Sequence, residues 1–260
     1  MDDEDKNDFK SKRQKLDTRD DSKFEKQRPN WFIAIPFEEE NIKDELRSVQ
    51  EAIVEKNTAL KRACIPPTKL HLTLFVFYSE DIEKVSDTIS KVVDRFPFEE
   101  EIKINANEIG HFSNQVIFSR LVLSPNLEKF WQYLADELFS NSIIDANDAK
   151  MENFKPHLTI MKLSKMRRPK KGGEKIKKIP PSMYEMFKSK TFGIQNVRKI
   201  QLLSMTLPQL ENGNYYCHQD FPLKMSIRKT PILCNTQIIC AVSCVTALLS
   251  IAVLWKKFKR

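Results

Sequence analysis

The sequence predicts an α+β fold of two pseudo-symmetric lobes around a central cleft, followed by a C-terminal transmembrane helix. Segments with the two-residue period of strands alternate with segments that have the 3.6-residue period of helices. The order strand, helix, histidine-bearing strand, helix, strand occurs twice, which indicates an internal duplication with one histidine strand in each lobe. A long uncharged run near the C-terminus has the length of a membrane span.

The composition fits one compact domain with appendages, since the chain has 260 residues and 41% of them are hydrophobic. The net charge of +8 is compatible with anionic partners such as nucleotides, RNA or acidic lipid, and equally with a solvated basic surface. None of the five cysteines forms a C-x-x-C pair, which excludes a disulfide framework and zinc-finger spacing. The N-terminal segment lacks the apolar stretch of a secretory signal, so we expect the folded part in the reducing cytosol or nucleus.

The chain divides into five segments. Residues 1–28 mix charges of both signs with almost nothing to bury, which is typical of a disordered arm. The folded domain is expected over 29–224, followed by a linker at 225–231, a transmembrane anchor over 232–255 and a basic tail at 256–260.

The first half of the domain contains three strands and two helices by pattern, and its last strand is at 101–109. The periods predict a strand over 31–36, a helix over 39–59, a histidine strand over 70–77, and a second helix that Ser79 caps. The apolar stripe of this second helix runs from Ile82 to Val92.

The second half repeats this order. It contains a strand at 116–123, a helix that opens at Ser124-Pro125, a histidine strand at 156–163, a short helix from Pro180 to Phe187, and final strands at 199–206 and 215–221. A basic loop, 165–178, follows the second histidine strand. We expect two sheets, one per lobe, that face each other across the cleft.

Two segments repeat the motif His-x-Thr: His71 with Thr73, and His157 with Thr159. Residues i and i+2 of a strand point to the same face, so each motif presents an imidazole and a hydroxyl side by side. Cleavage of a phosphodiester needs a base, an acid and donors for the non-bridging oxygens. Two imidazoles can hold opposite protonation states near neutrality, and threonine supplies donors without charge. The motifs therefore predict phosphodiester chemistry without metal or cofactor and with a bell-shaped pH profile.

A single triplet of this kind carries little information, because roughly 0.2 are expected by composition and a histidine on a strand is usually structural. Two triplets with matched apolar flanks, in corresponding places of two similar halves, indicate one shared site. The other two histidines, His111 and His218, have no matched partner and are interpreted as ordinary histidines.

The paired motifs resemble those of the two-histidine (2H) phosphoesterases, a group of RNA ligase-like cyclic and 2',5'-phosphodiesterases. Further segments resemble the phosphoesterase-like domain of gamma-type A-kinase anchoring proteins: 28–36, 109–116, 154–165, 179–185 and 212–218. The resemblance covers about residues 28–222. It implies a bilobal two-histidine phosphoesterase fold that binds nucleotides and cleaves 2',5'-linked oligoadenylates or related short RNA or cyclic nucleotide phosphodiesters.

The resemblance also implies roles for the motif residues. His71 and His157 are the acid–base pair, in either order, and Thr73 and Thr159 bind the phosphate. Intact motifs in both halves favour activity over a binding domain without catalysis.

Other candidates for nucleotide binding come from single residues. Phe112 could stack on a base or pack within its loop, and Lys155 could approach the phosphate or be solvated. Tyr215 or Tyr216 could line the cleft. The basic loop 165–178 could bind RNA backbone or anionic lipid, or simply be solvated.

The run 232–255 favours a tail anchor that holds the domain on the cytosolic side of the mitochondrial outer membrane or the endoplasmic reticulum. In the family that this chain resembles, an amphipathic helix downstream of the domain docks the regulatory subunit of cAMP-dependent protein kinase, protein kinase A. Here the apolar run replaces that region. The competing hypothesis is a membrane-anchored, nucleotide-binding scaffold that anchors protein kinase A regulatory subunits without catalysis.

Overall fold

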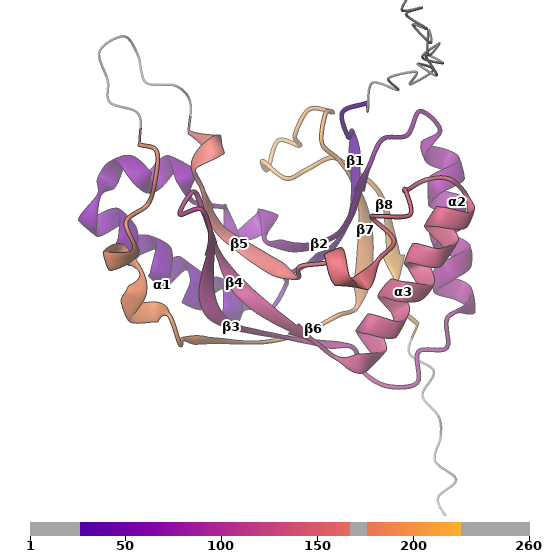
Figure 1. Ribbon diagram of the computed structural model, residues 1–260, viewed down its shortest axis with the longest axis horizontal. Helices are drawn as coiled ribbons and strands as arrows, with labels where there is room; N and C mark the ends of the chain where they lie inside the picture. The colour runs from indigo at the N-terminus through magenta and orange to yellow at the C-terminus, as the bar shows by residue number, and fades with distance from the viewer. Residues whose placement is uncertain (1–26, 167–175, 225–260) are drawn as a thin grey trace, which may run out of the picture.

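The computed structural model describes residues 27–166 and 176–224. Within these residues, eight strands form one antiparallel sheet in the order β6-β3-β4-β5-β2-β1-β7-β8, flanked by three α-helices (Figure 1). The strands are β1 (Trp31–Pro36), β2 (His71–Phe77), β3 (Lys103–Phe112), β4 (Val116–Leu123), β5 (His157–Lys162), β6 (Thr191–Asn196), β7 (Lys199–Ser204) and β8 (Cys217–Pro222). The helices are α1 (Glu40–Lys56), α2 (Ile82–Arg95) and α3 (Pro125–Ser140).

The sheet consists of two four-stranded halves that meet at β2 and β5. We call β2, β1, β7 and β8 the His71 half, and β5, β4, β3 and β6 the His157 half. The two central strands pair at one position, Leu72 with Leu158. The prediction of two separate sheets is therefore wrong, because the leucine between histidine and threonine in each motif joins the halves into one sheet.

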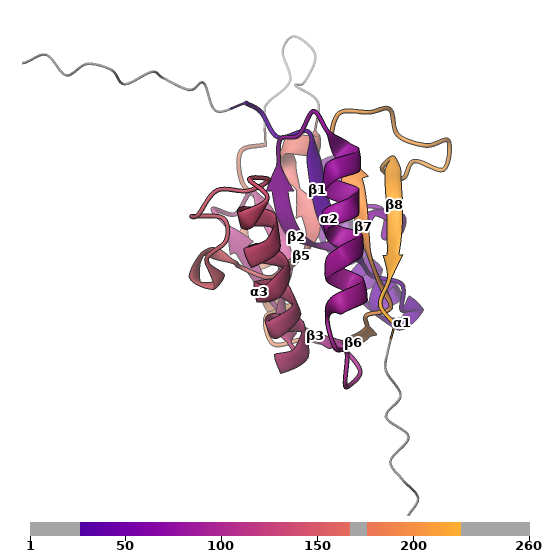
Figure 2. The same ribbon diagram turned by 90° about the vertical axis from the view of Figure 1, so that its right-hand side faces the viewer.

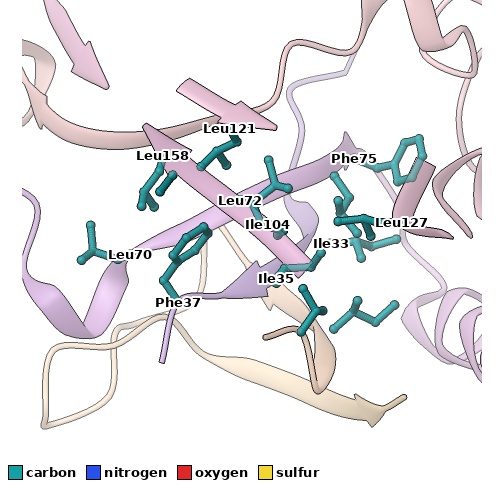
Figure 3. Packing of buried hydrophobic residues seen from close by; sticks show 14 of the residues in the cluster. Ile33, Ile35, Phe37, Leu70, Leu72, Phe75, Ile104, Leu121, Leu127 and Leu158 are labelled. Atoms are coloured by element: carbon teal, nitrogen blue, oxygen red, sulfur yellow. The ribbon is translucent and has the colours of Figure 1, made fainter. Parts of the chain in front are cut away.

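The face of the sheet opposite the histidines carries the hydrophobic core. Leu72 and Leu158 are fully buried, and Figure 3 shows them among Ile33, Ile35 and Ile104 from neighbouring strands. Burying one such side chain stabilises the fold by about 1.5–3 kcal/mol. The strand alternation thus commits the leucines to the core and turns histidine and threonine to the open face.

The helices cross between the halves. α1 follows β1 of the His71 half but packs on β5 and β6 of the His157 half. α3 follows β4 of the His157 half but lies beside α2 over the His71 half (Figures 1 and 2). The Trp131 ring of α3 stacks on Phe75 of β2 with their centroids 4.9 Å apart. The duplicated unit is therefore strand, helix, histidine strand, and each unit's helix covers the other half.

A buried glutamine fixes α1 to the second histidine strand. The apolar stripe of α1, Ile42, Leu46, Val49 and Ile53, is buried. On the same helix, Gln50 Nε2 donates to the backbone oxygens of Ile65, at 2.8 Å, and Ile160, at 2.9 Å. These bonds satisfy a side chain that is otherwise costly to bury and hold β5 against the helix.

The last two strands return to the first half of the sheet. β7 pairs with β1, and β8 pairs with β7 at the outer edge. The two lobes are therefore not the two halves of the sequence, since the His71 half takes strands from both ends of the domain.

Three local predictions differ from the structure. Strand β6 was not predicted, because its sequence Thr-Phe-Gly-Ile-Gln-Asn is short and is interrupted by Gly193, whose φ is +131°. Asp81, and not Ser79, caps α2, since its carboxylate accepts from Lys84 N at 3.0 Å. The helix predicted after Pro180 consists of two 3-10 turns, Pro181–Met183 and Glu185–Phe187.

The predicted arm up to residue 26, the linker 225–231, the anchor 232–255 and the basic tail lie outside the described residues. In the part of the chain that the structure describes, no helix has both the length and the apolar character needed to span a bilayer.

Candidate active site

The two motifs meet in one cleft, as predicted from their sequence pattern. His71, Thr73, His157 and Thr159 line a cavity of about 440 Å³ on the open face of the sheet, where β2 and β5 adjoin. All four side chains are half-buried. The Leu72–Leu158 pair places the two motifs antiparallel to each other. The two histidines therefore lie on opposite sides of this leucine pair along the strand direction.

The two imidazoles are held by the same hydrogen bond. His71 Nδ1 lies 2.7 Å from the Lys69 carbonyl oxygen, and His157 Nδ1 lies 2.8 Å from the Lys155 carbonyl oxygen. A carbonyl oxygen accepts only, so Nδ1 donates in both rings and carries the hydrogen. Nε2 is then the atom of each ring that is available to exchange a proton.

Aromatic rings fix the orientation of both imidazoles. The His71 ring lies 5.2 Å from Phe32 and 5.8 Å from Tyr215 between ring centroids. The His157 ring lies 5.1 Å from Phe112 and 5.4 Å from Phe118, in edge-to-face contacts. Packing of this kind restricts ring rotation and supports the hydrogen bond at Nδ1.

A glycine creates the space for one of these rings. Gly110 of β3 lies opposite Phe118 of β4, and a Cβ atom at position 110 would lie 2.5 Å from the Phe118 ring. Any larger residue would displace Phe118, and with it the support of His157.

The protonation of His71 is biased by its surroundings. Burial lowers the pKa of His71, the bond to the Lys69 carbonyl opposes this, and the positive charges of His157 and Lys162 lower the pKa further. The neutral form of His71 therefore persists to lower pH than in a solvated imidazole.

Three lysines also line the cleft: Lys69 and Lys162, which were not predicted as site residues, and Lys165, the first residue of the basic loop that was considered for binding RNA backbone or anionic lipid. Lys69 Nζ donates to Gln209 Oε1 at 2.6 Å and lies 5.2 Å from the Tyr215 ring centre. Lys165 Nζ donates to the Cys64 carbonyl at 3.0 Å. Burial, followed by the charge of Lys69, lowers the pKa of Lys165. The cleft thus presents fixed cations to an anionic group.

The secondary candidates have different placements. Phe112 is 40% exposed beside His157. Lys155 contributes its carbonyl to the site and also lines a second cavity next to His157. Tyr215 lines the cleft, whereas Tyr216 lies exposed on the same loop.

The remaining histidines lie outside the cleft lining. His111 Nδ1 accepts from Asn114 N at 3.2 Å, and His218 Nε2 lies 3.5 Å from a Glu83 carboxylate oxygen. Among the described residues, no group of three or more His, Cys, Asp or Glu side chains is placed to hold a metal ion.

The chain is similar to proteins of one family. The family model described as the AKAP7 2'5' RNA ligase-like domain matches residues 29–223. A-kinase anchor protein 7 isoform gamma from Homo sapiens is 32% identical over 197 residues, which are 73% of this chain and 56% of that protein. The chain thus spans just over half the length of this relative.

Solved structures are similar to this chain at lower identity. TT0787 of Thermus thermophilus has a TM-score of 0.52 and 18% identity, over 76% of this chain and 99% of its own. E. coli LigT complexed with NADP+ has a TM-score of 0.48 and 16% identity, over 76% of this chain and 100% of its own. At these identities, the similarity to TT0787 indicates a common fold.

Proposed function

We propose that this chain, which belongs to the AKAP7 2'5' RNA ligase-like domain family of 2H phosphoesterases, cleaves 2',5'-linked oligoadenylates or related short RNA or cyclic nucleotide phosphodiesters without a metal ion. The family membership predicted from the sequence is confirmed, and it supports phosphodiesterase chemistry in general. One observation carries the proposal: two imidazoles, each with Nδ1 bound to a carbonyl, line the same cleft as two threonines.

The surroundings of the histidines support an assignment that the sequence left open. His71 acts as the base, because burial and nearby cations favour its neutral form. Its Nε2 takes the proton from the attacking hydroxyl or water as the new P–O bond forms. His157 acts as the acid, and its Nε2 gives a proton to the leaving oxygen as the old P–O bond breaks.

The non-bridging oxygens of the phosphate need donors throughout this exchange. Thr73 and Thr159 supply hydroxyl donors, and Lys162 and Lys165 supply positive charge at the same cleft. Such preorganised donors stabilise the charge that develops in the transition state.

The test replaces each histidine alone. His71→Ala and His157→Ala should each reduce cleavage of 2',5'-oligoadenylate in EDTA by about 10²–10⁴-fold, with circular dichroism unchanged. His218→Gln is the matched control, because His218 lies outside the cleft lining and should leave the rate unchanged. Full activity in either alanine variant would remove the assignment.

We also propose that the run 232–255 anchors the domain to a membrane. The described chain leaves the sheet at the end of β8, and the loop 205–216 that contributes Tyr215 to the cleft enters β8 at its other end (Figure 1). This placement supports an anchor that does not cover the cleft. Alkaline carbonate extraction of the full-length chain should leave it in the membrane pellet, and release into the supernatant would refute the anchor.

A second candidate function is the anchoring of protein kinase A regulatory subunits without catalysis. The identity of 32% to a protein named A-kinase anchor protein 7 motivates it. A pull-down of the full-length chain with type II regulatory subunit tests this function, and absence of binding would exclude it.

A further inference from the structure

The cleft between β2 and β5 carries positive charge without a compensating carboxylate. Lys69, Lys162 and Lys165 line it, and no Asp or Glu is among the described residues of its lining. The two neighbouring cavities differ in this respect, because Glu38 lines the one next to β7 and Glu108 lines the one next to β4. A cleft lined by charges of one sign concentrates ions of the opposite sign. This cleft therefore favours an anionic occupant.

Lys162 is the cation of the cleft that no protein group holds. Lys69 and Lys165 each donate to a protein oxygen. In the part of the chain that the structure describes, no hydrogen bond or ion pair engages the Lys162 ammonium. Its charge nevertheless acts on His71, whose pKa it lowers after burial and His157, so the ammonium lies close to the site. Lys162 is thus available to pair with an anion in the cleft.

The N-terminal arm joins the domain at the rim of this cleft. The Asn30 side chain exchanges two hydrogen bonds with the Ser79 backbone, each of 2.9 Å, and its carbonyl accepts from Met205 N at 2.9 Å. Met205 lines the cleft, and so does Phe32, two residues after Asn30. The start of β1 and the loop 205–216 lie at the same end of the sheet (Figures 1 and 2). The segment before Asn30 is therefore attached within a few residues of the cleft.

The charges of this arm are unevenly distributed along the sequence. Residues 2–8, Asp-Asp-Glu-Asp-Lys-Asn-Asp, contain five carboxylates and one lysine. Residues 9–26 contain four carboxylates and seven basic residues, and the loop 165–178 and the tail 256–260 are also basic. The acidic segment 2–8 is therefore opposite in charge to the cleft, whereas these other segments have the same sign as the cleft.

The arm is long enough to bring the acidic segment to the cleft. Residue 8 is 19 positions before residue 27. A chain of this length spans at most about 63–68 Å, and the flexible chain that its composition predicts has an end-to-end distance of about 22–26 Å. A segment tethered in this way has an effective concentration on the order of 1 mM at its target. Even weak intrinsic binding then fills the cleft for a large part of the time.

We propose that the acidic segment 2–8 docks in the cleft between β2 and β5 and competes there with phosphate groups. Its carboxylates pair with Lys162 and accept from the hydroxyls of Thr73 and Thr159. This contact is autoinhibitory, because an anion that occupies these donors excludes a second one. The inference goes beyond the proposed function, since it names an occupant of the cleft and does not depend on turnover.

Carbodiimide coupling tests the contact directly, because it joins a carboxylate to an amine only where the two touch. The full-length chain is coupled at low protein concentration and low ionic strength, digested, and analysed by mass spectrometry. We expect residues 2–8 to be joined to Lys162 or Lys165 several times more often than to Lys91. Lys91 is the matched control, since it is exposed on α2, on the other face of the sheet.

Salt provides a second control on the coupling. At 0.5 M NaCl, where charges are screened within a few ångströms, the preference for the cleft lysines should disappear. Equal coupling to Lys162 and Lys91 at low salt would overturn the inference. Products that join two chains, seen as dimers on a denaturing gel, would assign the cleft to the arm of a second copy and would also overturn it.

A charge variant tests the inhibition. It replaces four carboxylates of the acidic segment by amides: Asp2→Asn, Asp3→Asn, Glu4→Gln and Asp5→Asn. With an intrinsic dissociation constant of about 0.1–1 mM, its KM for 2',5'-oligoadenylate should fall about 2- to 10-fold at unchanged kcat, because the segment competes with substrate.

The matched control removes the same number of charges from the part of the arm next to the domain. Its substitutions are Asp17→Asn, Asp20→Asn, Asp21→Asn and Glu25→Gln. It should keep the wild-type KM. An unchanged KM in the first variant, or an equal fall in both variants, would overturn the inference. If no phosphodiester is cleaved, the proposed function fails, and the coupling experiment still decides whether the acidic segment occupies the cleft.

Discussion

The His71 and His157 halves have the same backbone plan but different surroundings. In both halves, a histidine donates Nδ1–H to the carbonyl two residues earlier. In both, a β-bulge directly after the threonine shifts the pairing register with the neighbouring strand. On the His71 half, the loop 205–216 walls a polar cavity beside the histidine. On the His157 half, the histidine adjoins an exposed Phe112 and a more apolar hollow.

This difference indicates how a duplicated motif acquires two roles. The strands fix the tautomer and direction of both rings, so the proposed catalytic pair is symmetric at the level of the backbone. The loops, which the duplication does not copy, decide burial and polarity around each ring. The proposed assignment of His71 as the base therefore depends on these loops and not on the strands.

The largest expected effect tests whether the two halves form one site. We expect the double variant His71→Ala/His157→Ala to lose no more activity than either single variant, about 10²–10⁴-fold, because an acid and a base that act in one step fail together. Rates of all three variants with the same oligoadenylate measure this. A double loss equal to the product of the single losses would mean that the halves act independently.

The next effect concerns the helix that connects the halves. Trp131 of α3 stacks between Phe75 of the first histidine strand, at 4.9 Å, and Phe154 before the second, at 4.8 Å. We expect Trp131→Ala to lower the free energy of unfolding by about 3–5 kcal/mol, measured by urea denaturation. Phe139→Ala on the same helix is the control, because Phe139 is 48% exposed, and it should change stability by less than about 0.5 kcal/mol.

A small effect of Trp131→Ala would contradict the interpretation that α3 clamps both histidine strands. The variant should also lower activity more than its folded fraction explains, since Phe75 and Phe154 flank the two motifs in the sequence. Trp131→Phe, which keeps an aromatic ring in the stack and removes the unpaired indole N–H, should be milder in both measurements.

The meeting of the two motifs in one cleft could be predicted from the sequence, because the motifs occur in corresponding places of two similar halves. Histidine and threonine two residues apart lie on the same face of a strand, and the leucine between them indicates that the opposite face is buried. The alternation of periods also predicted most strands and α1 to α3. These features depend on local sequence, so they can be predicted without knowledge of the tertiary contacts.

The rest of the site depends on contacts between distant segments. Lys162 and Lys165 follow the second motif as part of a basic run, and no local pattern distinguishes them from solvated lysines. Tyr215 could not be separated from Tyr216, because the cleft position depends on how the 205–216 loop folds over β1. The packing of each helix on the other half could not be predicted from the sequence either. A helical period indicates which face of a helix is buried, but not which element covers that face.

A moderate effect is expected at Phe112, which is 40% exposed beside His157. If a base stacks there, Phe112→Ala should weaken substrate binding by about 1–3 kcal/mol, seen as a higher KM with a smaller change in kcat. Phe112→Tyr keeps the ring and should restore the wild-type KM. An unchanged KM in Phe112→Ala would show that the ring only packs against Phe118 and His157.

The smallest expected effect tests why His71 is the base. Burial is the main cause of its lowered pKa, and the charge of Lys162 adds to it. Since the neutral form is active, the acid limb of kcat/KM should lie below the ordinary histidine value of about 6.5. Lys162→Gln removes one cation, so the pKa of His71 should rise and the acid limb should move to higher pH.

The same lowered pKa predicts the pH dependence of stability. The unfolded chain binds the His71 proton at a higher pH than the folded chain, so this contribution is complete above about pH 6.5 and is lost as the pH falls toward the lower folded value. His71→Gln should therefore show a shallower loss of unfolding free energy between neutral and mildly acidic pH than the wild-type chain. An acid limb that Lys162→Gln moves to lower pH, or a stability slope that His71→Gln leaves unchanged, would remove the basis for assigning His71 as the base.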